Sequence, residues 1–328
     1  MKKAVLILLF FASAQCIAQD LRAVADSAIA ITERNIYNPE LLNSESWQEF
    51  KAEMRSTEIK DIKDLREKWS NASSKLPFTH YYLFKTPTAT PAAPATGNTA
   101  DSRNKSFDLK QLDEGITLLT IKDFSAYKED MLPVIDSLKQ WSPRYLIIDL
   151  RKNPGGTIAP AVPLVQYLID RTMYGGVLLG RNYFLTHQEL PTVAEYKNLR
   201  SFSEASYEEI IKAIHESDGL CLVFEPEKVT FRGMVYVLTD RGTASTCEPL
   251  VYGLKTNGYA TIVGERTAGA MMSAEPFNVA GGFTLFMPTA DYFTADGKHL
   301  DRVGVEPDIE VPSDKALEKT LEIIRTPK

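Results

Sequence analysis

Two turns in this sequence carry the residue types that could do covalent chemistry. In "GTASTCE", Ser245 follows a predicted buried strand and stands at the start of a predicted helix. That position exposes a serine hydroxyl and places helix N–H groups beside it, including the amide of Thr246. Ser245 is therefore a candidate nucleophile. The alternative is that Ser245 or Thr243 only caps the helix.

The second turn, "DLRKNPGG", ends in Gly155 and Gly156 and runs into another predicted helix. Glycines let the backbone approach a ligand closely, and a following helix offers N–H groups to an anion. An oxyanion hole uses the same physics. No Gly-Lys-Ser/Thr ending follows, so nucleotide binding is disfavoured. A purely structural turn is the alternative, and a third turn, "GERTAGAMMSAEPF", could close beside the other two.

The first 18 residues, "MKKAVLILLFFASAQCIA", have the composition of a secretory leader: Lys2 and Lys3, an apolar run and a small residue at Ala18. The apolar run is shorter than the roughly 20 residues that a transmembrane helix needs. We therefore expect an exported chain, periplasmic or extracellular, without a transmembrane segment.

The 37 basic and 43 acidic residues give a net charge of −6, which becomes −8 once the leader's two lysines are removed. No basic cluster stands out, so nucleic acid is not an expected partner. Only four histidines and no cysteine pairs at metal spacing are present, so we expect no metal site. Cys221 and Cys247 either form a disulfide or are two buried thiols.

The spacing of apolar residues predicts the organisation of the chain. Apolar residues three and four apart indicate two or three helices within residues 19–85, followed by a short strand at "FTHYYLF". Residues 86–106, rich in Pro, Ala and Thr, are typical of a linker. Strands then alternate with helices over residues 107–328, which predicts an α/β core. The stretch 177–231 fits this rhythm poorly and is interpreted as an insertion that could form a lid.

Three segments taken together resemble the tail-specific, or C-terminal-processing, serine peptidases, which are related to the tricorn core protease and to retinoid-binding repeats. They are "YLIIDLRKNPGG", "GTASTCEPLVYGLKTNGYATIVGERTAG" and "GGFTLFMPTADYFTADGKHLDRVGVEPDIEVP". The resemblance covers roughly residues 115–312. It implies a crotonase-like α/β peptidase core, preceded here by the small helical region, and no metal or organic cofactor.

The resemblance also implies roles for individual residues. Ser245 would be the nucleophile, and the amides of Gly155 or Gly156 and of Thr246 would form the oxyanion hole. The lysine that serves as base in many relatives falls on Ala270, and neither that position nor Ala274, where an assisting glutamine falls, can take a proton. The histidine of the tricorn-like branch aligns nearest to Thr120. An acid of that branch lies near Asp301.

A substitute base therefore has to come from elsewhere. Glu248 lies three residues after Ser245 on the same side of the predicted helix, where it could be a base or a favourable charge in the first turn. His80 resembles a histidine motif upstream of the core in many relatives, and an imidazole suits base work. Lys255 is displaced about 15 Å along the helix axis and is interpreted as a charge at the helix end.

The expected function is an exported serine peptidase that cleaves peptide or protein substrates through an acyl-enzyme on Ser245. The alternative is an impaired relative that binds a peptide or a lipophilic ligand without cleaving it, because the family lysine position is Ala270.

Overall fold

The computed structural model describes residues 21–87, 106–202 and 206–326, and contacts divide the chain into two compact units. Of the described residues, the first unit contains 21–87, Gly180–Gln188 and Met272–Asp291, and the second unit contains the others. The predicted leader, and residues 88–105 of the predicted linker, lie outside the described residues.

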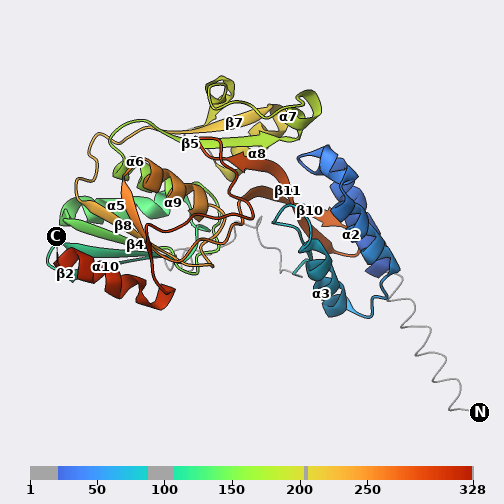
Figure 1. Ribbon diagram of the computed structural model, residues 1–328, viewed down its shortest axis with the longest axis horizontal. Coiled ribbons are helices and arrows are strands. Elements are labelled where there is room, and N and C mark those ends of the chain that lie inside the picture. Colours follow the sequence, from blue (N-terminus) through green and yellow to red (C-terminus); the bar gives the residue numbers. More distant parts are fainter. Residues whose placement is uncertain (1–20, 88–105, 203–205, 327–328) are drawn as a thin grey trace, which may run out of the picture. The chain divides into compact units, whose positions relative to one another are not determined.

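The N-terminal part of the first unit is helical, as the apolar spacing predicts. Residues 21–35 form a helix, and further helical elements follow at η1 (Pro39–Asn43), α2 (Glu45–Ser56) and α3 (Ile62–Ser73) (Figure 1). The Ser44 and Asp61 side chains cap α2 and α3. A cluster of packed aromatic rings fills the space between the helices, comprising Trp47, Phe50, Trp69 and Tyr81.

Three antiparallel strands complete the first unit. β1 (Tyr82–Lys85) and β10 (Met272–Val279) both pair with β11 (Phe283–Phe293), which confirms the predicted strands at "FTHYYLF" and near the C-terminus. Alternate residues such as Leu285 and Met287 are buried in the same core as the helices. This core therefore combines the N-terminal helices with residues 272–291, which lie far from them in the sequence.

The second unit is built on a mixed six-stranded sheet in the order β12-β9-β8-β4-β3-β2. Only β2 runs antiparallel to its neighbour, and the remaining pairs are parallel. The strands are β2 (Phe107–Asp113), β3 (Ile116–Ile121), β4 (Tyr145–Asp149), β8 (Met234–Thr239), β9 (Ala260–Gly264) and β12 (Ile309–Glu310). The predicted mixed α/β class is therefore confirmed.

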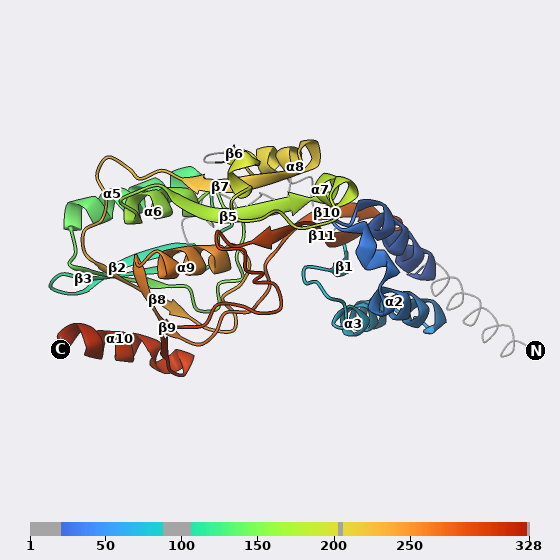
Figure 2. The same cartoon turned by 45° about the horizontal axis from the view of Figure 1, so that its top comes forward.

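Helices cover both faces of this sheet (Figure 2). On one face, α10 (Ala316–Arg325) follows η3 (Ser313–Lys315) and packs Ala316 and Ile324 on buried strand residues such as Ile147 and Val263. The opposite face is covered by α5 (Lys128–Trp141), α6 (Ala161–Leu168) and α9 (Cys247–Thr256). The two faces are both apolar because the parallel strands are buried on both sides.

The predicted insertion at 177–231 contains more regular structure than its sequence indicates. β5 (Met173–Gly180) pairs antiparallel with β7 (Gly219–Phe224), which pairs in parallel with β6 (Arg200–Phe202). The helices α8 (Tyr207–Glu216), α7 (Arg181–Thr186) and η2 (Tyr196–Asn198) complete the segment. α7 belongs to the first unit. A role for this segment as a lid stays a prediction.

Two leucines of α5 give a matched test of this packing. Leu138 is fully buried, whereas Leu132 is 41% exposed. We expect Leu138→Ala to lower the free energy of unfolding by about 2–5 kcal/mol, because it removes buried methyl groups and leaves a cavity. Leu132→Ala should change it by less than about 1 kcal/mol. Urea unfolding followed by circular dichroism measures both, and equal losses would contradict the assigned orientation of α5.

Candidate functional site

The three turns singled out in the sequence lie at one edge of the sheet of the second unit. They follow β4, β8 and β9, which are adjacent and parallel, so their carboxyl ends meet. We refer to them as the glycine turn (residues 150–156), the serine turn (240–246) and the closing loop (265–271). The structure therefore brings the glycine turn together with two segments that lie far from it in the chain.

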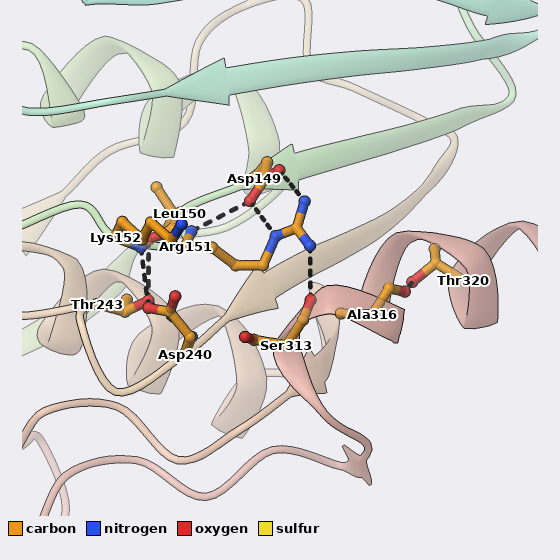
Figure 3. Close-up of polar contacts among 9 residues, drawn as sticks. All are labelled: Asp149, Leu150, Arg151, Lys152, Asp240, Thr243, Ser313, Ala316 and Thr320. Carbon is orange, nitrogen blue, oxygen red and sulfur yellow. Dashed lines mark hydrogen bonds and ion pairs between the residues drawn. The ribbon is translucent and has the colours of Figure 1, made fainter.

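Buried acidic side chains fix the glycine turn (Figure 3). Asp240 Oδ1 accepts hydrogen bonds from the amides of Lys152 (2.9 Å) and Gly242 (2.8 Å), which ties the glycine turn to the serine turn. Arg151 donates to both oxygens of Asp149 (2.8 and 2.6 Å) and to the Ser313 carbonyl (2.6 Å). The pKa of the Arg151 guanidinium is raised, chiefly by this pairing.

Asn153 holds the centre of the site, although the sequence reasoning does not single it out. Its fully buried side chain donates to the Ile121 carbonyl (2.9 Å) and accepts from the Gly155 amide (2.9 Å). Its own carbonyl accepts the Ala244 amide of the serine turn (3.0 Å). An asparagine that bonds the amide two residues later is typical of a turn, so "NPGG" carries a signal that could have identified it.

Ser245 has a left-handed backbone conformation, with φ 56°. For a residue other than glycine this conformation costs about 1–2 kcal/mol. The Ser245 amide donates to the Ala270 carbonyl (3.0 Å) of the closing loop. The helix α9 that follows has no side-chain cap, so Ser245 and Thr243 do not play the capping role considered above. Within the described ranges, the half-buried Ser245 hydroxyl has no hydrogen-bond partner.

The glycine turn presses directly against this serine. A Cβ atom added to Gly155 (φ 95°) would lie 2.6 Å from the Ser245 Cβ, and one added to Gly156 (φ 141°) would lie 2.4 Å from the Phe124 carbonyl carbon. The Thr246 hydroxyl also donates to the Gly156 carbonyl (2.6 Å). Side chains are therefore sterically excluded at both glycines.

The amides proposed for the oxyanion hole differ in availability. The Gly155 amide already donates to Asn153 Oδ1. The Gly156 and Thr246 amides have no acceptor among the residues that the structure describes. Among the described residues, the Gly156 and Thr246 amides are therefore not yet hydrogen-bonded, whereas the Gly155 amide is, and an oxyanion-hole role for any of the three stays a prediction.

Glu248 is fully buried and accepts four hydrogen bonds. Its Oε1 accepts from the Thr267 hydroxyl (2.6 Å) and the Gly269 amide (2.8 Å). Its Oε2 accepts from the amides of Ala270 (2.7 Å) and Ser245 (3.2 Å). Burial raises the pKa of the Glu248 carboxyl, and these hydrogen bonds oppose that shift. A role as general base stays a prediction.

The closing loop carries the position at which the resemblance places a lysine. The Ala270 carbonyl binds the Ser245 amide, so residue 270 is immediately beside the serine. The neighbouring Met271 amide donates to Oδ1 of buried Asp301 (2.8 Å). Asp301 is thus near the site, and it fixes the same loop as Glu248.

His80 belongs to the first unit and Ser245 to the second, so their predicted pairing stays a prediction. His80 also has a left-handed backbone (φ 58°), and its Nδ1 lies 2.9 Å from the Thr79 hydroxyl. Its ring lies beside those of Tyr82 and Phe286, at centroid distances of 6.4 and 6.2 Å.

The two cysteines are buried free thiols rather than a disulfide. Burial raises the pKa of the Cys247 thiol, which suits a core residue better than a nucleophile.

Lys255 pairs with Asp308 (3.1 Å) and donates to the Glu306 carbonyl at the end of α9, as its interpretation as a helix-end charge predicts. In the described part of the chain, no helix combines the length and apolar character needed to cross a bilayer.

Two glycines with positive φ test the contact between the glycine and serine turns. Gly155→Ala would place a methyl group against Ser245, whereas Gly258 (φ 74°) has open space around it. Each alanine would have to adopt a left-handed backbone conformation, which costs about 1–2 kcal/mol. Only Gly155→Ala adds a steric clash. We expect Gly155→Ala to reduce the free energy of unfolding well beyond Gly258→Ala. Equal losses in thermal unfolding would contradict the tight contact.

Comparisons with known proteins agree with the resemblance described above. The sequence profile of peptidase family S41 matches residues 115–311. The carboxy-terminal processing protease CtpA of Bacillus subtilis (strain 168) is 26% identical over 200 residues, which are 60% of this chain and 35% of that protein. The C-terminal processing peptidase of Tetradesmus obliquus is 25% identical over 51% of this chain and 28% of its own length. The chain therefore spans about a third of the curated relatives it matches.

Solved structures share the fold. The photosystem II D1 C-terminal processing protease aligns with a TM-score of 0.53 at 12% identity, covering 94% of this chain and 98% of that one. The profile match covers more than half of the chain and includes the glycine turn, the serine turn and the closing loop. The chain accordingly belongs to peptidase family S41.

Proposed function

We propose that this protein is a serine-type peptidase with Ser245 as its nucleophile. The observation that carries the proposal is the backbone of Ser245, which is left-handed and lies directly against Gly155 of the glycine turn. Strained backbone conformations of this kind cluster at functional sites. Family membership supports the same reaction class.

In the proposed reaction, Ser245 Oγ bonds to the carbonyl carbon of the scissile peptide and passes its proton to a base. The negative charge that develops on the carbonyl oxygen is stabilised by the Gly156 and Thr246 amides, and losing one such donor typically costs about 10²–10³ in turnover. The C–N bond then breaks, the amine leaves with a proton, and water hydrolyses the acyl-enzyme.

We propose His80 as the base, ahead of Glu248. Both Glu248 oxygens already accept two hydrogen bonds each, so taking a proton from Ser245 would require one of them to be displaced. The His80 Nδ1 lies near the Thr79 hydroxyl. An imidazole is the side chain best suited to take and return a proton near neutral pH. In this proposal Asp301 acts on the closing loop rather than as an acid.

A second candidate function is binding of a peptide or lipophilic ligand without cleavage, and Ala270 is the observation that favours it. A serine without a base retains only the catalysis of the oxyanion hole and of binding, about 10³–10⁴ over water. For either function we propose an exported protein, because of the leader-like first 18 residues. The relatives' names favour protein substrates processed near their carboxyl ends.

Labelling with a biotinylated alkyl fluorophosphonate, which reacts with activated serines, tests the nucleophile. We expect the parent protein to be labelled and Ser245→Ala to lose the label entirely. Ser125→Ala is the matched control, because Ser125 is an exposed serine next to Phe124 and should keep the label. Labelling that survives in Ser245→Ala would exclude the proposed nucleophile. A parent protein that is never labelled would favour the binding function.

A double variant tests the base. We expect His80→Ala to slow fluorophosphonate labelling by about 10²–10⁴-fold, the usual contribution of a general base. Adding Ala270→Lys should restore part of the rate, because residue 270 is hydrogen-bonded to Ser245 and would bring an amine beside its hydroxyl. Unchanged labelling of His80→Ala would exclude His80 and direct attention to Glu248.

A further inference from the structure

We infer that Glu248 is a positioning residue that holds the Ser245 turn in its reactive conformation by binding backbone amides. The inference rests on the proposed role of Ser245 as nucleophile. It differs from a base role because the carboxylate acts through the main chain and does not exchange a proton with substrate or with the Ser245 hydroxyl.

The carboxylate of Glu248 binds both the serine turn and the closing loop. Oε2 bridges the amides of Ser245 and Ala270, while Oε1 binds the Thr267 hydroxyl and the Gly269 amide. One side chain thus joins the serine turn to the closing loop. The Ser245 amide is shared between Oε2 (3.2 Å) and the Ala270 carbonyl (3.0 Å), so the carboxylate and the loop together hold the left-handed conformation.

The hydrogen bonds between Glu248 and Ser245 differ from those of an ordinary capping box. In Ser-x-x-Glu boxes the glutamate returns to the serine amide, and the serine hydroxyl accepts the glutamate amide. Here Glu248 makes the first bond, but its own amide donates to the Ser245 carbonyl (2.8 Å). The hydroxyl is therefore not consumed by the helix, and the same four-residue spacing holds the turn while leaving Oγ available.

All four groups that Glu248 binds donate a hydrogen bond to its carboxylate. Three are amides that can only donate, and the Thr267 hydroxyl also accepts the Val305 amide (2.7 Å). A carboxylate satisfies four donors, whereas an isosteric glutamine must turn its NH₂ group toward at least one amide. Glu248→Gln keeps the volume of the side chain and removes this match.

The experiment compares Glu248→Gln with the control Thr267→Val. Thr267→Val removes one bond to Oε1 and the bond to Val305, but leaves Oε2 on Ser245 and Ala270. We expect both variants to melt at a lower temperature than the parent. Glu248→Gln should slow fluorophosphonate labelling by about a hundredfold, the effect of a misplacement of about 1 Å, with the parent's pH profile. Thr267→Val should stay within about threefold of the parent.

Amide hydrogen exchange gives a readout that does not depend on catalysis. In Glu248→Gln, we expect faster exchange in residues 243–248 and 268–271 with unchanged protection in β4 and β8. If the parent is never labelled, the nucleophile proposal fails and exchange alone decides on Glu248: local opening supports positioning, and unchanged exchange overturns it.

Three further results are decisive. Parent-like labelling of folded Glu248→Gln would overturn the inference. Loss of the pH dependence of labelling in Glu248→Gln would assign Glu248 as the base instead. If Glu248→Gln fails to fold, Glu248→Asp, which keeps the charge on a shorter side chain, should label at a rate between that of the parent and background. A parent-like rate in Glu248→Asp would overturn the inference.

Discussion

The contact between Gly155 and Ser245 is the constraint on which the rest of the site depends. The two turns approach so closely that a methyl group has no space at position 155. The turns can remain this close only if their backbone groups find partners without regular strand pairing. Asn153 supplies two of these partners, because its side chain binds the Gly155 amide and its carbonyl binds the Ala244 amide. The position of Ser245 therefore follows from the main chain of both turns.

Buried carboxylates also accept hydrogen bonds from backbone amides elsewhere at this edge of the sheet. Asp240 accepts amides of the glycine and serine turns, Glu248 accepts amides of the serine turn and the closing loop, and Asp301 accepts the next amide of that loop. Buried amides need partners, and irregular turns lack the ladder that supplies them in a sheet. Acidic residues that could be taken from sequence for catalytic acids or bases thus have a structural use that the turns themselves require.

The sequence predicts those features that depend on local pattern. Alternation and helical spacing identify β3, β4, β8, β9 and α9, and the small residues of "GTASTCE" and "NPGG" mark the two turns. Features that depend on distant partners are missed. The pairing of β5 with β7, whose Val177 and Leu220 are buried, joins segments far apart in the sequence. The occupied Gly155 amide depends on the Asn153 rotamer, and the first unit collects residues 272–291 because Leu285 and Met287 share a core with the N-terminal helices.

The alanine at position 270, where the resemblance places a lysine, is compatible with this geometry, since residue 270 holds Ser245 through its carbonyl and not through its side chain. A well-formed turn is therefore not in itself evidence of turnover. The identity of residue 245 is more informative. A protein that used this surface only for binding would be more stable with glycine there, because glycine adopts φ 56° without the cost of about 1–2 kcal/mol that serine pays. The cost of serine at this position is offset only if its hydroxyl has a function, and in the described part of the chain no group hydrogen-bonds to that hydroxyl. The strained serine therefore supports the proposal of catalysis over that of binding alone.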